Sequence, residues 1–212
     1  MSRWEKVLVG GFIGAAVPFT LMVIGWWGSA SLLMAGLLSV TDAQIALVAW
    51  LGLALGLLLD FALLRRWVGV FYQVDLRLLA PLYLFWTAVA TAFFMGLPLG
   101  NLLLGTAAGA YVGRRVVNVA VPGPDGRRLV GCTSLFTAGV TSAAALGIGL
   151  LAVREPYTLA PLRRLLGLDQ TTAILTVDLA IVAAAVVLLA VIQFWLTRLS
   201  AAVTIRLVPD HE

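Results

Sequence analysis

Long stretches without a charged residue constrain this chain more than any other feature. They cover residues 7–41, 78–113 and 129–153. About 20 consecutive apolar residues are enough for a helix to cross the hydrocarbon core of a bilayer. A single soluble domain would have nowhere to bury runs of this length. The chain is therefore expected to be an all-α, polytopic integral membrane protein.

The composition supports a membrane location. Hydrophobic residues make up 62% of the chain and charged residues 11%, whereas about half of a soluble domain is apolar. The net charge is +4, but the arginines stand in short groups between apolar runs and form no continuous basic face. We therefore expect the lipid bilayer, and not a nucleic acid, as the surrounding partner.

The residues that commonly carry catalysis or bind metals are scarce. The chain has one cysteine, Cys132, and one histidine, His211. This leaves no disulfide within the chain, no thiolate or imidazole metal cluster and no bis-histidine haem site. No histidine lies near Cys132 or Ser134 to act as a base. We expect no catalytic residue, no cofactor and no metal, and the chain is not expected to be an enzyme.

The apolar pattern predicts a single transmembrane domain over residues 1–212. Its six spans are expected at about 6–27, 42–64, 80–96, 101–119, 131–153 and 171–197. Residues 28–40 are expected to form a loop, and Thr41 and Gln44 have the spacing of a capping box at the start of the second span. Residues 122–126 have a turn sequence. Between spans five and six, leucines alternating with Arg163 and Arg164 predict a short amphipathic external helix.

The uncharged run 78–113 is too long for one ordinary span. We expect a helical hairpin with a surface turn at residues 96–101, because a turn is the commoner use of Gly and Pro. A re-entrant pair of helices, with this break buried at membrane depth, is the alternative. Asn101 would cap the fourth helix in the hairpin, and in the re-entrant pair its amide would face a pathway.

The basic residues predict how the chain is threaded. Six spans place both termini on one side, and the positive-inside rule assigns that side to the cytoplasm. The expected cytoplasmic residues are Arg3, Lys6, Arg65, Arg66, Arg77, Arg114, Arg115, Arg127, Arg128, Arg198 and Arg206. Only Arg154, Arg163 and Arg164 would lie outside. We expect a prokaryotic plasma membrane protein with N- and C-termini in the cytoplasm.

Glycines recur at intervals of four residues or multiples of four within the expected spans. This spacing puts them on one face of a helix, where a neighbouring helix can approach closely. The stripe could serve packing within one chain, a homo-oligomer or another membrane protein. The glycines expected to pack are Gly52, Gly56, Gly105, Gly109, Gly113, Gly139 and Gly147.

Two carboxylates lie inside expected spans, where a charge is costly unless it is paired or hydrated. For Asp60 we favour a local ion pair with Arg65 over a role in a polar path. Asp178 has no basic residue one turn away, so it needs a partner on another segment, a hydrated cavity or a proton. Gln193 and Thr91 are expected to bridge helices by hydrogen bonds. Asp178, Asp60, Asn101 and Gln193 are the candidates for a polar path.

Three classes of function follow. The first is a carrier, a channel or a solute-binding membrane subunit with a polar path near Asp178. The second is a non-catalytic assembly or scaffold subunit whose glycine faces dock other helices. The third is an intramembrane or lipid-modifying enzyme, which the missing catalytic groups disfavour. The sequence does not identify a solute.

Overall fold

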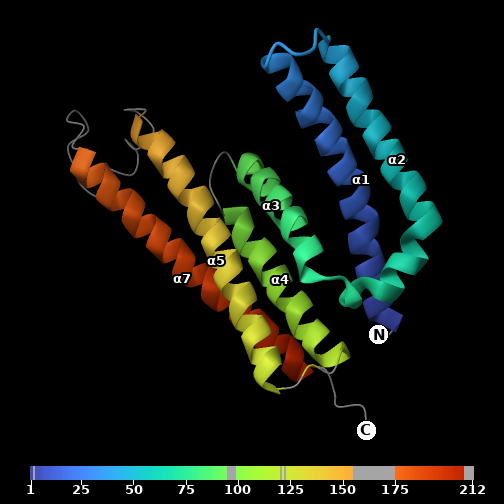
Figure 1. The fold of residues 1–212 in the computed structure, drawn as a ribbon, viewed down its shortest axis with the longest axis vertical. Coiled ribbons are helices and arrows are strands. Elements are labelled where there is room, and N and C mark those ends of the chain that lie inside the picture. The colour runs from blue at the N-terminus through green and yellow to red at the C-terminus, as the bar shows by residue number, and fades with distance from the viewer. Residues whose placement is uncertain (2, 95–98, 120, 122, 155–174, 208–212) are drawn as a thin grey trace. The chain divides into compact units, whose positions relative to one another are not determined.

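The computed structural model describes residues 1, 3–94, 99–119, 121, 123–154 and 175–207. Helices make up nearly all of this part of the chain, as the sequence predicts (Figure 1). A single 3-10 turn, η1 (Phe71–Gln73), follows the second helix. The helices are α1 (Arg3–Met34), α2 (Asp42–Val70), α3 (Leu76–Phe93), α4 (Leu99–Asn118), α5 (Gly123–Arg154) and α7 (Leu175–Leu207). The expected external helix at 154–170 lies outside the described residues, except for Arg154 at the end of α5.

Several helices are longer than the sequence suggests. Helix α1 continues to Met34, through most of the expected loop at 28–40. Helix α5 begins at Gly123, so the turn predicted at 122–126 is wrong for residues 123–126. Pro124 lies in the first turn of α5, where an N–H would have no helical acceptor, so the proline costs the helix little. Helix α7 runs to Leu207, through part of the expected frayed tail.

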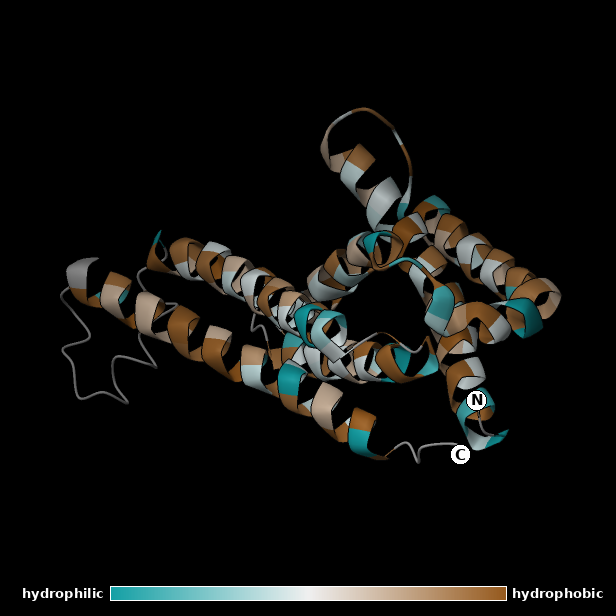
Figure 2. Cartoon of the chain, turned by 60° about the horizontal axis from the view of Figure 1, so that its bottom comes forward, coloured by the Kyte–Doolittle hydropathy of each residue, from teal (hydrophilic) through white to brown (hydrophobic). Residues whose placement is uncertain are grey.

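Five of the described helical segments are long and apolar enough to cross a membrane, and the shortest of these has 18 residues. They are Arg3–Met34, Asp42–Gln73, Leu76–Phe93, Gly123–Arg154 and Val177–Leu207. Helix α4 is not among them. Hydrophobic residues cover much of the length of these helices (Figure 2). The chain is thus all-helical with several apolar helices, and a sixth span stays a prediction.

The helices form two compact units, residues Met1–Phe71 and Tyr72–Glu212. In unit 1, α1 and α2 pack as an antiparallel hairpin. The backbone of Gly25 lies against Val48, and a Cβ atom added to Gly25 would be 2.9 Å from the Val48 carbonyl oxygen. Gly52 and Gly56 lie similarly close to Leu21 and Pro18 on α1. Gly52 and Gly56 of α2 therefore lie in the interface of the hairpin.

The capping box predicted at the start of α2 is confirmed. The Thr41 backbone N–H donates to Gln44 Oε1 at 2.8 Å, and the Gln44 N–H donates to Thr41 Oγ1 at 3.4 Å. These bonds satisfy two donors that the first turn of a helix would otherwise leave open.

Unit 2 contains α3, α4, α5 and α7. The run 78–113 forms two antiparallel helices, α3 and α4, as expected for a hairpin. At one end Arg115 donates hydrogen bonds to the carbonyls of Tyr72, at 3.1 Å, and of Val74. At the other end an added Cβ on Gly100 would be 2.8 Å from the Ala90 side chain. Most of the connecting residues, 95–98, lie outside the described part, so the choice between a surface turn and a re-entrant break stays a prediction.

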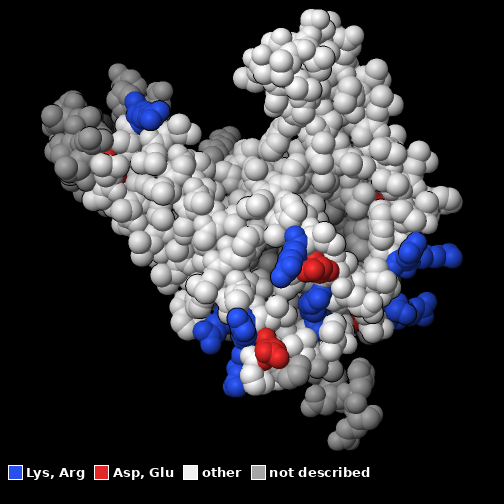
Figure 3. Space-filling model, viewed as in Figure 1, with Lys and Arg blue, Asp and Glu red and all other residues white. Residues whose placement is uncertain are grey.

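The basic side chains of each unit gather at one end of its helices. In unit 1, Gly10 contacts Val68, which brings the start of α1 to the end of α2. In unit 2, Gly113 faces Ala201 and Gly126 faces Val116, so the ends of α4 and α7 meet the start of α5. Figure 3 shows arginine and lysine side chains at these helix ends and a largely uncharged surface along the helices. Among the described basic residues of unit 2, Arg154 lies at the other end.

Candidate functional site

Unit 2 encloses a group of uncharged polar side chains. Asn101, Thr137, Thr141, Gln193 and Thr197 are each 0% exposed. Thr87 is 5% exposed, and the hydroxyl of Tyr83 is also buried. We call these seven residues the polar cluster: Tyr83, Thr87, Asn101, Thr137, Thr141, Gln193 and Thr197. They come from all four helices of the unit, so the cluster depends on the tertiary fold.

The glycines of α4 make room for the α7 side of the cluster. A Cβ atom added to Gly105 would overlap the side-chain amide of Gln193. One turn further, Gly109 faces the Thr197 backbone, and Gly113 faces Ala201, whose carbonyl oxygen would be 2.5 Å from an added Cβ. Helices α4 and α7 therefore run parallel here, and the absence of side chains on α4 lets Gln193 lie flat between them.

Helix α5 supplies the third side of the polar cluster. Thr137 Oγ1 and Thr197 Oγ1 are 2.9 Å apart and share a hydrogen bond. Gln193 Nε2 donates to Thr197 Oγ1 at 3.4 Å. Thr141 lies one turn beyond Thr137, and Gln193 lies one turn before Thr197. Because α5 and α7 are antiparallel, Thr141 and Gln193 belong to the same level of the unit.

Helix α3 completes the cluster. The Tyr83 hydroxyl is close to the hydroxyls of Thr87 and Thr141, yet none of the three makes a hydrogen bond of normal geometry to a described residue. The side-chain oxygens of Asn101 and Gln193 also lack a partner within the described part of the chain. A buried polar atom without a partner costs roughly 1–3 kcal/mol. The three hydroxyls lie close enough to serve one another, so the Asn101 and Gln193 oxygens are the two atoms that call for water or a ligand.

The sequence suggests that Asn101 caps α4, but in the structure it does not. It is the third residue of α4, inside the helix, and its side chain is fully buried. A capping residue has non-helical backbone angles and stands before the first turn. The Asn101 Nδ2 group instead donates a long hydrogen bond of 3.5 Å to Thr91 Oγ1 on α3. The bridging expected of Thr91 is therefore present within unit 2, whereas the hydrogen bond that Gln193 donates goes to Thr197 of its own helix.

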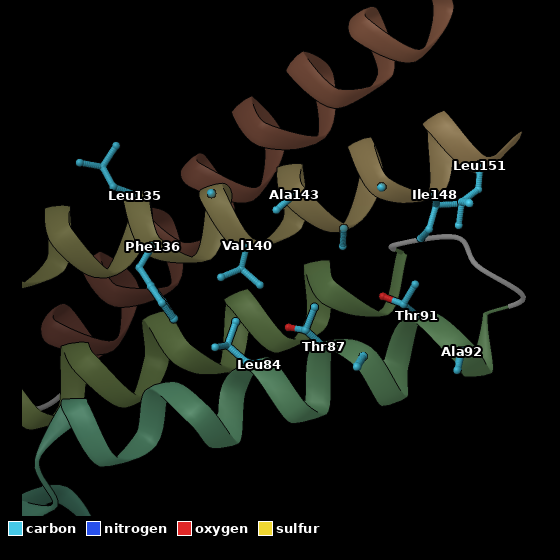
Figure 4. A pocket seen from close by; sticks show the side chains of 14 residues that line it. Leu84, Thr87, Thr91, Ala92, Leu135, Phe136, Val140, Ala143, Ile148 and Leu151 are labelled. Carbon is cyan, nitrogen blue, oxygen red and sulfur yellow. The ribbon is translucent and has the colours of Figure 1, made fainter. Parts of the chain in front are cut away.

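An open groove of about 840 Å³ lies between α3 and α5 and reaches the cluster (Figure 4). Its described lining is apolar except for Thr87 and Thr91. Gly139 and Gly147 border it, and an added Cβ on either would meet no described atom within 4 Å. These two glycines of α5 thus open a groove and do not take part in the close packing expected of them.

Neither of the two carboxylates belongs to the cluster. Asp60 belongs to α2 in unit 1, and neither of its oxygens has a described partner, so the ion pair expected with Arg65 is absent from the described structure. Asp178 is 2% exposed in the first turn of α7. Fifteen residues separate Asp178 from Gln193 on α7, which is roughly 22 Å along a helix. The structure therefore does not bring Asp178 and Gln193 to one place, and Asp60 belongs to the other unit.

Sequence reasoning missed most of the cluster. Tyr83 and Thr87 are four residues apart, as are Thr137 and Thr141. The same spacing joins Gln193 to Thr197. Small polar residues that repeat at this interval share a helix face, and this periodicity was the available signal.

Neither a metal-binding group of His, Cys, Asp and Glu nor a strand occurs in the described residues.

Comparisons with known proteins give no family assignment. No protein-family model matches the chain. Neither a curated protein nor a solved structure matches it.

Proposed function

We propose that the chain is an integral membrane protein that binds or conducts a small, uncharged, hydrogen-bonding solute through unit 2, as a carrier, a channel or a solute-binding subunit. The observation that carries this proposal is the polar cluster, in which the buried side-chain oxygens of Asn101 and Gln193 have no described partner. Membrane bundles commonly use polar side chains to bridge helices, but bridging satisfies these atoms and does not leave them open.

The chemistry of the cluster indicates the class of solute. Its members are hydroxyl and carboxamide groups, which donate and accept hydrogen bonds without carrying charge. Asp178, the nearest carboxylate along α7, is roughly 22 Å away. A charged solute would need a counter-charge at this depth, so a neutral solute fits better. The groove between α3 and α5 supports access, because Thr87 belongs to both the groove and the cluster.

Flux through proteoliposomes tests the proposal. Purified full-length protein would be reconstituted, and uptake of glycerol and urea would be followed by stopped-flow light scattering. After the initial osmotic shrinkage, we expect liposomes that contain the protein to regain their volume faster than empty liposomes. Thr141→Val and Gln193→Met should lower the protein-dependent rate by about tenfold, since each removes a hydrogen-bonding group whose loss costs about 1–1.5 kcal/mol in a site that uses it.

Ser142→Ala is the matched control. Ser142 follows Thr141 on α5, but its hydroxyl donates to the Ala138 carbonyl of the same helix at 2.8 Å. Its removal should leave the rate unchanged. If the wild-type protein conducts neither solute, or if all three variants behave alike, the cluster is not a solute site.

A scaffold subunit is the second candidate, and the groove favours it. Gly139, Gly147 and four alanines line the groove with small side chains, and small residues let a transmembrane helix approach closely. Gly139→Leu would fill the groove. If the protein is a scaffold subunit, Gly139→Leu should abolish co-purification of a partner helix. If it binds or conducts a solute, Gly139→Leu should block the solute's access to the polar cluster and lower the flux.

A further inference from the structure

A second unusual polar group lies in unit 1, on α2. Asp60 is 6% exposed, and neither carboxyl oxygen has a partner among the described residues. Between residues 43 and 64 it is the one charged residue of an apolar run. An isolated carboxylate in such surroundings is too costly to persist in its charged form. The group must therefore gain a partner or a proton.

The position opposite Asp60 is Gly14 on α1. A Cβ atom added to Gly14 would be 4.0 Å from Asp60 Oδ2, which is ordinary contact. Pro18 stands one turn later in the same helix. Proline has no N–H, so the Gly14 carbonyl lacks the donor that residue 18 of a regular helix would supply. Asp60 thus lies beside a turn of α1 that has a spare hydrogen-bond acceptor.

We propose that Asp60 is a proton-binding site within the apolar part of α2, and that its protonated carboxyl group donates a hydrogen bond to the Gly14 carbonyl. The proton satisfies both groups at once. Without the proton both groups are acceptors, and neither can donate to the other. This site belongs to unit 1 and does not rest on the function proposed for the polar cluster of unit 2.

The basic residues of the hairpin lie toward one end and Asp42 stands at the other, so the described residues leave the carboxyl group without a counter-charge. On α2 the nearest are Arg65 and Arg66, at least five residues away. On α1 they precede Gly14 by eight residues or more: Arg3, Glu5 and Lys6. A hard metal cation would need about six oxygen ligands, whereas this place offers one carboxyl group and one carbonyl. A proton is therefore the ligand that fits.

Carbodiimide labelling tests the site in the full chain reconstituted in liposomes. Dicyclohexylcarbodiimide enters the membrane and adds to protonated carboxyl groups, and mass spectrometry locates the adduct. We expect Asp60 to be labelled at pH 6 and labelling to fall as the pH rises toward 9. A water-soluble carbodiimide should modify Asp42, which is exposed at the start of α2, and leave Asp60 unmodified.

Pro18→Ala tests the hydrogen bond. The alanine N–H can satisfy the Gly14 carbonyl, so the protonated Asp60 loses its acceptor. The midpoint of the labelling profile should fall by about one pH unit, a tenfold loss of proton affinity.

Asp60→Asn supplies a donor that does not titrate. Thermal stability of the wild-type protein should decrease as the pH rises through the labelling midpoint, because the folded state binds the proton more tightly than the unfolded state; Asp60→Asn should remove this decrease.

Three results would overturn the proposal. The first is equal labelling of Asp60 and Asp42 by the water-soluble reagent. The second is a labelling profile that does not change with pH or with Pro18→Ala. The third is protection of Asp60 by sodium ions at constant pH, which would assign the site to a cation.

Discussion

The close approach of α4 and α7 gives the sharpest structural prediction, through Gly109→Ala. An added Cβ would be 2.9 Å from the Thr197 carbonyl carbon and 3.1 Å from its Cα, with the carbonyl oxygen closer still. Carbon atoms normally approach to about 3.5–4.0 Å. Because the atoms that are met belong to the backbone, no side-chain rotation relieves the contact. Helix α7 would have to move away by roughly 1 Å.

Gly139→Ala is the matched control for this change. Gly139 is also an interior glycine of an apolar helix, but an added Cβ meets no described atom within 4 Å. Both substitutions gain up to about 1 kcal/mol from the higher helix propensity of alanine. Only Gly109→Ala adds the cost of overpacking, about 1–3 kcal/mol. The difference between the two variants therefore isolates the packing cost, whatever the propensity gain is in a membrane.

Reversible unfolding measures this difference. Protein in mild detergent would be titrated with sodium dodecyl sulfate and followed by tryptophan fluorescence. We expect the free energy of unfolding of Gly109→Ala to lie about 2 kcal/mol below that of Gly139→Ala. Gly109→Leu should prevent folding of unit 2. Equal free energies for the two alanine variants would refute the assignment of Gly109 to a tight helix contact.

The remaining predictions concern other contacts. Gly56→Ala should destabilise the α1–α2 hairpin by about 1–3 kcal/mol in the same titration, because the new Cβ would meet the backbone of Pro18. Thr197→Val should cost about 1 kcal/mol, since it removes the hydrogen bond to Thr137; an unchanged free energy would show that this bond contributes nothing. Arg115→Ala should speed amide hydrogen exchange in the connector before α3, whose carbonyls it binds. Single cysteines placed near each terminus, in a cysteine-free background, should react with an impermeant maleimide from the same side; reaction from opposite sides would exclude an even number of spans.

Local sequence patterns predicted some elements well. The capping box at Thr41 and Gln44 depends on two residues that are three positions apart, so residues close in the sequence are enough to predict it. The division of run 78–113 into two helices followed from its length and from the Gly and Pro residues at its centre. Helix ends were harder, because glycine and serine at residues 28–31 do not stop a helix that continues to be apolar.

The candidate site depended on information that no local pattern contains. Gly109 and Gly139 look alike in the sequence, yet one faces the α7 backbone and the other borders an open groove. The sequence predicts that Asn101 is a helix cap because it stands at the start of the expected fourth span, whereas α4 begins at Leu99. The sequence does not distinguish Thr141, since its importance comes from Tyr83 on α3 and from its place at the level of Gln193 on α7. The structural role of each of these residues depends on which helices become neighbours in the folded unit.

The modest hydropathy of α4 has a consequence for biosynthesis. Over its described residues this helix is less apolar than the five candidate spans, and the helix that covers its glycine face, α7, is translated more than 50 residues later. We expect α4 to enter the lipid poorly while the nascent chain is still attached and to settle only once α7 has emerged. Nascent chains truncated before residue 175 should then leave a glycosylation acceptor next to α4 on the wrong side, and correct placement in such a fragment would show that α4 inserts unaided.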